Sequence, residues 1–213
     1  MAAWVETLLI LLTLTNLTLV AMSRLGACIR TVALQGIVLG LLTICVHPHT
    51  PSLYVLLLAG GSIGLKSVVF PLLLGRAMRD THIRHEIEPF VGYGVSILVA
   101  ALALPVSFWL GSRLPLPRPA STLIVPLAFH AILTGLFLIV SRRKAITQVL
   151  GYLVLENGIY TFGICLVQES TLLVELGVLL DIFVAVFVMG ITIFHINQEF
   201  NHIDTDRLSA LRD

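Results

Sequence analysis

Charged residues are scarce in this sequence. Asp, Glu, Lys and Arg make up 12% of the 213 residues, whereas they supply about 25% of an average soluble domain. Apolar residues make up 57% of the chain, and the mean hydropathy is +1.00. A soluble core of this length could not bury so much apolar surface, so part of it must face something other than water. The composition therefore argues against a soluble enzyme, a disordered chain and a nucleic-acid binder.

Sequence motifs for chemistry are also missing. There is no GxxxxGKS/T, HExxH or GxSxG pattern, which argues against nucleotide, metalloprotease and hydrolase sites. None of the three cysteines forms a CxxC pair. We expect Cys28, Cys45 and Cys165 to be small buried side chains, although a Cys45–Cys165 bridge could form at one face in an oxidising compartment. The sequence predicts no catalytic residue, metal ligand or cofactor of its own, and whether the chain forms part of an enzyme stays open.

Long apolar stretches dominate the chain instead. A membrane helix needs about 20 mostly apolar residues, and short breaks with turn-formers or charges separate the stretches. The first stretch lacks the basic residues and the cleavage site of a signal peptide, so we expect it to remain as a helix. Seven stretches qualify or nearly do: 4–23, 28–46, 53–76, 90–111, 120–140, 145–168 and 171–197. The sequence predicts an all-α polytopic bundle with seven transmembrane helices, forming a single membrane domain over residues 1–213.

Lysine and arginine predict the orientation of this bundle. With seven spans, one face carries only two basic residues, Arg113 and Arg118, and Lys66 lies inside a span. The opposite face carries ten: Arg24, Arg30, Arg76, Arg79, Arg84, Arg142, Arg143, Lys144, Arg207 and Arg212. Because basic residues concentrate on the cytoplasmic side, we expect the N-terminus outside and the C-terminus in the cytoplasm. The predicted location is the inner (cytoplasmic) membrane, crossed several times.

Lys66 is a charge in the middle of the third stretch. An ionisable group at the bilayer centre costs about 3 kcal/mol on insertion scales, so such residues are candidates for function. Pro71 follows five residues later and frees a backbone carbonyl in a helix. A kinked helix with an amine beside a free carbonyl suits a hydrated cavity. Two interpretations stay open, namely proton transfer or its control, and a structural ion pair with a neighbouring subunit.

Glu156 is the corresponding acid in the sixth stretch. Desolvation favours the protonated form of a carboxyl group there unless a cation faces it, which suits a group that loads and releases protons. Tyr152 and Tyr160 lie one turn to either side on the same helix face. We assign these tyrosines and Asn157 supporting roles. The alternative is a hydrogen bond that holds two helices together.

Three further titratable residues are weaker candidates. Asp181 lies near mid-depth in the seventh stretch, and Glu175 lies nearer its outer end, on a different helix face. His130 is central in the fifth stretch, as either a hydrogen-bonded core residue or a relay step. Lys66, His130, Glu156 and Asp181 would all lie near the midplane. That placement favours a lateral proton relay along the membrane plane.

Several distinctive motifs follow one another in the second half of the chain. They are SRRK at 141–144, GYLVLENG at 151–158, LDIFVAVFVMG at 180–190, FHINQEF at 194–200 and DTDRLSAL at 204–211. These stretches closely resemble the hydrogenase-4 component E family, most specifically over 141–211. Lys66 followed by Pro71 also looks like this family. The resemblance implies a membrane subunit of a group 4 [NiFe]-hydrogenase, a formate hydrogenlyase or a related complex. Redox chemistry would then occur in other subunits.

The last three stretches also resemble the K subunit of respiratory complex I and the C subunit of Mrp-type antiporters. The buried acids of the K subunit fall on Glu156 and Asp181 by motif, with Glu156 about one turn deeper and Asp in place of Glu at the second site. This implies a four-helix part over 1–118 and a three-helix part over 119–213. Neighbours would be antiporter-like subunits, a quinone-site-like anchor and a peripheral redox module, with no nucleic acid.

Three functions compete at this point. The first is a subunit that relays protons laterally through its buried charges and joins antiporter-like subunits. The second is a free-standing secondary transporter, although short loops and few polar residues leave little for substrate specificity. The third is a structural scaffold whose buried charges are ion pairs. The sequence does not separate the first from the third, nor H⁺ from Na⁺ as the ion.

Overall fold

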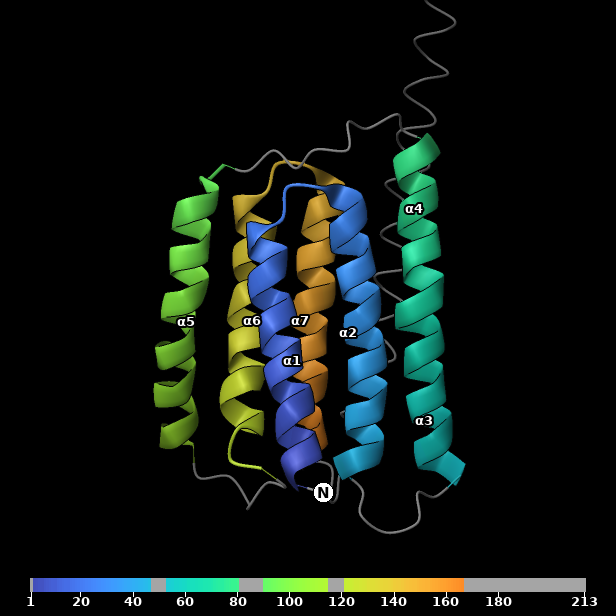
Figure 1. Ribbon diagram of the computed structural model, residues 1–213, viewed down its shortest axis with the longest axis vertical. Helices are drawn as coiled ribbons and strands as arrows, with labels where there is room; N and C mark the ends of the chain where they lie inside the picture. The colour runs from blue at the N-terminus through green and yellow to red at the C-terminus, as the bar shows by residue number, and fades with distance from the viewer. Residues whose placement is uncertain (1, 47–52, 81–89, 115–120, 167–213) are drawn as a thin grey trace, which may run out of the picture.

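A computed structural model describes residues 2–46, 53–80, 90–114 and 121–166, which are helical apart from short turns and caps. Six continuous helices run roughly parallel to one another (Figure 1). They are α1 (Ala2–Ala21), α2 (Leu25–Val46), α3 (Leu53–Ile63) continuing through the π-helical turn η1 (Gly64–Val69) into α4 (Phe70–Asp80), α5 (Tyr93–Arg113), α6 (Ile124–Ser141) and α7 (Ala145–Leu166). These helices coincide with the first six predicted stretches to within four residues at each end. Helix α1 begins and ends two residues earlier than predicted, α2 begins earlier, α5 and α6 begin later, and α4 ends later.

The all-α prediction is confirmed for the described part of the chain. Four helices, α1, α2, α5 and α6, are long and apolar enough to cross a membrane by length and composition. The seventh predicted stretch, 171–197, lies outside the described residues. The total of seven spans and the orientation of the termini therefore stay predictions.

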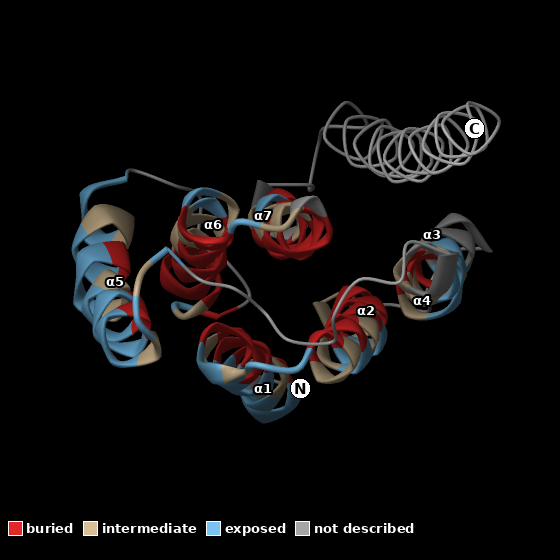
Figure 2. Ribbon diagram, turned by 90° about the horizontal axis from the view of Figure 1, so that it is seen from above, coloured by how far each residue is buried: buried red, intermediate tan, exposed pale blue. Residues whose placement is uncertain are grey.

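The six helices form two rows of three. Seen from above, α5, α6 and α7 make one row, and α1, α2 and α3–η1–α4 make the other, with most buried residues between the rows (Figure 2). Helix α7 packs against α6 in its own row and against α2 in the opposite row. Helix α1 packs against α2, α5 and α6. Described residues of the predicted parts 1–118 and 119–213 thus contact each other through three helix pairs: α5 with α6, α2 with α7, and α1 with α6.

Glycines allow two of these contacts to be close. A Cβ at Gly151 of α7 would lie 2.8 Å from the backbone nitrogen of Ile139 in α6. A Cβ at Gly36 of α2 would lie 2.7 Å from the Cβ of Lys66 in η1. Small residues at such positions let helix backbones approach each other in membrane proteins. Gly151 therefore lets α7 pack closely against α6, and Gly36 lets α2 pack closely against η1.

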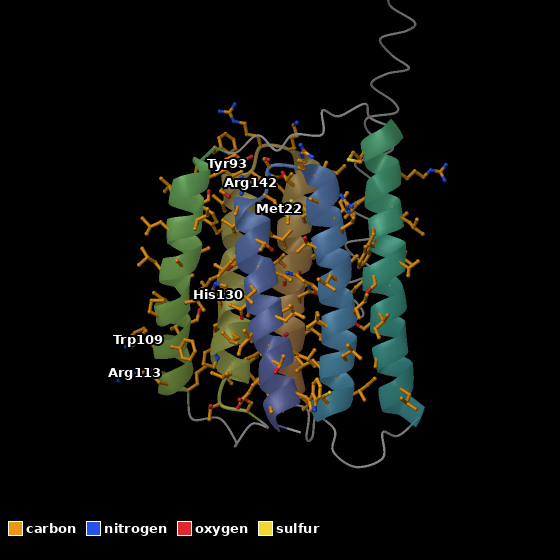
Figure 3. All side chains as sticks on the ribbon, in the orientation of Figure 1. Met22, Tyr93, Trp109, Arg113, His130 and Arg142 are labelled. Atoms are coloured by element: carbon orange, nitrogen blue, oxygen red, sulfur yellow. The ribbon has the colours of Figure 1, made fainter. Side chains whose placement is uncertain are left out.

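One end of the bundle has the features of a membrane interface. Trp109 and Arg113 lie at the end of α5 where α1 begins, and the arginine lies over the tryptophan ring at 5.6 Å (Figures 1 and 3). Trp4 in the first turn of α1 is 69% exposed. Trp is enriched where a membrane meets water. Between this interface and the other end, α5 presents an almost wholly apolar outer face, as expected for a helix that contacts lipid or a larger partner.

Candidate functional site

Lys66 and Glu156 form a buried ion pair between the two rows. The Lys66 Nζ atom lies 2.5 Å from Glu156 Oε1. The two residues are 2% and 1% exposed. A buried charge pair is tolerated only with good geometry and further hydrogen bonds, because both ions have left water. The sequence predicted each residue separately, with a neighbouring subunit as one partner for the lysine. In the structure the partner of Lys66 belongs to the same chain.

The π-helical turn η1 positions the lysine. The Phe70 amide bonds to the carbonyl of Leu65, five residues earlier, which is the π-helical pattern. Pro71 has no N–H and cannot continue this pattern toward the carbonyl of Lys66. A π-helical turn inserts an extra residue into a helix and often occurs at functional sites. The kink expected from Pro71 is thus a local change of helix type around Lys66.

Two of the three predicted supporting residues contact Lys66. Asn157 Oδ1 accepts a hydrogen bond from Lys66 Nζ at 3.1 Å. The ammonium also lies 4.9 Å from the centre of the Tyr160 ring, a cation–π distance. The Tyr160 hydroxyl lies 3.0 Å from Thr43 Oγ1 of α2. Tyr152 instead packs, partly buried, against the apolar cluster that includes Leu153.

A chain of amides continues the site toward α1. Asn157 Nδ2 donates to Gln35 Oε1 at 3.1 Å. Gln35 Nε2 donates to Asn16 Oδ1 at 2.7 Å and to Thr15 Oγ1 at 3.1 Å. Gln35 is 0% exposed and Asn16 is 1% exposed. The sequence analysis did not single out Gln35 or Asn16. The signal that could have found them is an amide in the middle of an apolar helix, which must bond to another helix in a membrane.

His130 occupies a separate position between α5 and α6. It lies at mid-height in the bundle (Figure 3) and is 0% exposed. Its Nε2 lies 3.2 Å from the Ala100 carbonyl oxygen of α5 and 3.5 Å from Thr134 Oγ1. No hydrogen bond within the described residues joins His130 to Lys66 or Glu156. This geometry is that of a hydrogen-bonded core histidine, the first of the two interpretations.

Arg142 has a role that the sequence analysis missed. The count of basic residues treated it as a surface charge, but it is 1% exposed. Its Nη2 donates to the carbonyl of Val20 at 2.8 Å, and the guanidinium lies 5.4 Å from the Tyr93 ring (Figure 3). Burial lowers the pKa of Arg142. The ordinary pKa of an arginine side chain is so high that the guanidinium stays charged. Arg142 thus caps the carbonyl end of α1, where a positive charge is favoured.

The remaining predicted acids, Asp181 and Glu175, lie outside the described residues. Glu156 Oε2 is buried and has no hydrogen-bond partner among the described residues. The described part of the chain holds no group of three or more His, Cys, Asp and Glu side chains that could bind a metal ion. The site can hold one acid and one base in direct contact. Such a pair can hold or exchange a proton, and the second oxygen of Glu156 is available to a further group.

Comparison with known proteins finds two kinds of relative. It is 30% identical over 204 residues to the uncharacterized protein Rv0085 of Mycobacterium tuberculosis, a match that covers 95% of this chain and 93% of the relative. It is 29% identical over 150 residues to hydrogenase-4 component E of Escherichia coli and of Shigella flexneri, covering 69% of this chain and 68% of those proteins. No protein-family model matches the chain, and no solved structure matches it. The chain therefore belongs to the family of Rv0085, and hydrogenase-4 component E is a more distant relative.

Proposed function

We propose that this chain is a membrane subunit of a hydrogenase-type redox complex in the cytoplasmic membrane. The relation to hydrogenase-4 component E supports the assembly, since that protein is by name one component of a hydrogenase. Charged side chains buried among apolar helices support a role in the membrane. Redox chemistry belongs to other subunits in this proposal. The partners are antiporter-like membrane subunits, a quinone-site-like anchor and a peripheral redox module, for which a nickel–iron hydrogenase is the first candidate.

Within such a complex, the chain relays protons laterally, and the Lys66–Glu156 ion pair carries this proposal. A proton that reaches the carboxylate of Glu156 neutralises it and leaves the buried ammonium of Lys66 without its counter-charge. An unpaired buried charge is costly, so the proton must move on or the lysine must shift. Arrival of a proton at Glu156 therefore acts on Lys66, 90 residues away in sequence and on another helix.

Other predicted residues would extend the relay. Asp181 and Glu175 of the seventh predicted span are proposed as the next acids. Glu156 offers a second carboxylate oxygen that has no partner among the described residues. His130 would be a separate station between α5 and α6. Its Nδ1 atom is buried and has no hydrogen-bond partner in the described ranges. His130 lies on α6 and Glu156 lies on α7. A proton path between them would require a further group that connects the two side chains.

A scaffold role is the second candidate, and one observation favours it. The Lys66–Glu156 contact, together with Asn157 and Tyr160, ties the helix α3–η1–α4 to α7. A pair that only joins helices would have this geometry. The two roles differ in what happens when both charges are removed together, because a scaffold tolerates an apolar replacement.

Partner identification tests the proposed assembly. The tagged chain would be extracted from native membranes with a mild detergent, and the proteins that purify with it would be identified by mass spectrometry. We expect antiporter-like subunits together with a redox module. A chain that purifies alone, folded and stable, would contradict the subunit proposal and favour a free-standing transporter.

A further inference from the structure

We infer that Gln35 is a positioning residue for Lys66, acting through Asn157. The inference rests on the proposed function only in taking the Lys66–Glu156 pair as the functional centre. Gln35 does not touch Lys66 through a polar contact of its own. It holds the Asn157 side chain in the one orientation in which its oxygen faces the ammonium.

The direction of the amide chain follows from its two ends. Lysine has only donors, so Asn157 must turn its oxygen toward Lys66 Nζ and its NH₂ group toward Gln35. Gln35 must then accept with Oε1 and donate with Nε2 toward α1. At the far end, the Thr15 hydroxyl donates to the Leu12 carbonyl at 2.7 Å and is left to accept from Gln35. Both ends demand the same direction, so each amide presents its oxygen toward the lysine.

Such an aligned chain is electrostatically complementary to the ammonium of Lys66. Hydrogen-bonded groups in a low-dielectric interior polarise one another, and every amide dipole here has its negative end toward the ammonium. Amide side chains do not gain or lose protons near neutral pH, so the chain of amides does not itself carry protons. It positions the lysine beside Glu156 and leaves proton movement to the ion pair.

The backbone of α2 supports this arrangement sterically. Gln35 is followed by Gly36, where an added Cβ would lie 2.7 Å from both Lys66 Cβ and Ser67 Oγ. The helix α2 therefore touches η1 directly at the residue next to Gln35. Because Gln35 is 0% exposed, water cannot replace its hydrogen bonds without local opening. Steric and polar support for Lys66 thus come from neighbouring residues of one helix.

Replacing Gln35 should release Lys66 locally. Gln35→Leu leaves Asn157 Nδ2 without its acceptor, and the asparagine can turn away from the ammonium. Reactivity of the lysine with acetic anhydride reports this release. The anhydride acylates only an accessible, unprotonated amine, and an ammonium held in a buried ion pair has no lone pair to offer. The chain has two lysines, Lys66 and Lys144, so mass spectrometry assigns the labelled peptides directly. Lys144 provides the internal reference.

Two controls separate release from general loosening of the bundle. Cys28 is 2% exposed within an apolar cluster that several helices share, and its reaction with N-ethylmaleimide reports loosening in the same sample. Thr161→Val is the matched variant. Thr161 is fully buried on α7, and within the described ranges its hydroxyl bonds to the Asn157 backbone carbonyl at 2.7 Å, so its loss leaves the amide chain intact. Gln35→Met, which keeps the side-chain length, serves as the second variant if Gln35→Leu does not fold.

Labelling would be done on the full chain in native membrane vesicles. We expect Gln35→Leu to raise labelling of Lys66 about tenfold relative to Lys144, the change expected for one lost hydrogen bond to a charged group. Cys28 should stay protected, and Thr161→Val should match the natural protein. Unchanged labelling of Lys66, or a parallel rise at Cys28, would overturn the inference. The assay needs no proton-coupled activity, so normal coupling in a variant with released Lys66 would count against the proposed function instead.

Discussion

The Lys66 ammonium has three different neighbours in the middle of the bundle: a carboxylate, an amide oxygen and an aromatic ring. The carboxylate of Glu156 balances its charge. The oxygen of Asn157 and the face of Tyr160 occupy further sides of the ammonium. Each neighbour offsets part of the cost of removing the ammonium from water. The same set of contacts makes either residue of the ion pair expensive to replace alone.

At this scale, single and paired substitutions should behave differently. Glu156→Leu leaves Lys66 as an unpaired buried charge and should lower the free energy of unfolding by about 3–5 kcal/mol. The pair Lys66→Met with Glu156→Leu removes both charges and should recover most of that loss, because apolar replacement of a buried pair is often neutral. Chemical unfolding of the chain in detergent would measure both effects.

Proton coupling of the assembled complex then separates the two proposed roles. For a relay, the paired variant assembles with its partners but has lost coupled proton movement. A scaffold would recover assembly and coupling together. Full coupling in a complex that lacks both charges would therefore exclude the relay.

Helix η1 and its contact with α2 decide where the lysine lies. The π-helical turn shifts Lys66 relative to an uninterrupted helix, and Gly36 lets α2 approach it. Position 36 faces η1, so a side chain there would collide with Lys66 and Ser67. The contact between these two elements, rather than either helix by itself, fixes the site.

A substitution at this contact should therefore lower the free energy of unfolding more than a substitution elsewhere on α2. Gly36→Ala should destabilise the chain by about 1–3 kcal/mol, as expected for overpacking. Gly26→Ala is the matched control, because nothing lies within 4 Å of a Cβ there. That change should be neutral or stabilise α2 by up to about 1 kcal/mol, since alanine is the better helix former. Thermal unfolding in detergent compares the two, and equal effects would contradict the packing role of Gly36.

Across the whole molecule, the two ends of the bundle differ in chemistry. Trp109 and Arg113 mark one end, and the turn with Arg142 and Arg143 marks the other (Figure 3). Most basic residues near the helix ends lie at this second end. Arg113 is the exception among those that the structure describes. The positive-inside rule then predicts that the end with Arg143 faces the cytoplasm.

Cysteine accessibility tests this orientation. Arg113 and Arg143 are both exposed, so a cysteine at either position should react in a background without the native cysteines. Arg113→Cys should react with a membrane-impermeant maleimide added outside intact cells. Arg143→Cys should react only after the cells are made permeable. The reverse pattern would show that the chain crosses the membrane in the opposite direction.

Much of the helical framework follows from the sequence alone. A run of about 20 apolar residues forms a helix in a membrane because the backbone must satisfy its own hydrogen bonds there. That requirement is local, so the sequence alone predicts the six described helices. The same apolar runs make the charges of Lys66 and Glu156 unusual. It also left Gln35 and Asn16 unnoticed, because uncharged amides disturb an apolar run less than charges do.

Only the tertiary structure decided which polar groups meet. Lys66 and Glu156 are 90 residues apart in sequence, and their contact depends on which faces of the helices pack together. The same packing turned Arg142 inward to cap α1 and placed His130 against α5, away from the ion pair. Helix formation depends on neighbouring residues along the chain. The choice of partner depends on close packing between distant helices, which no local pattern records.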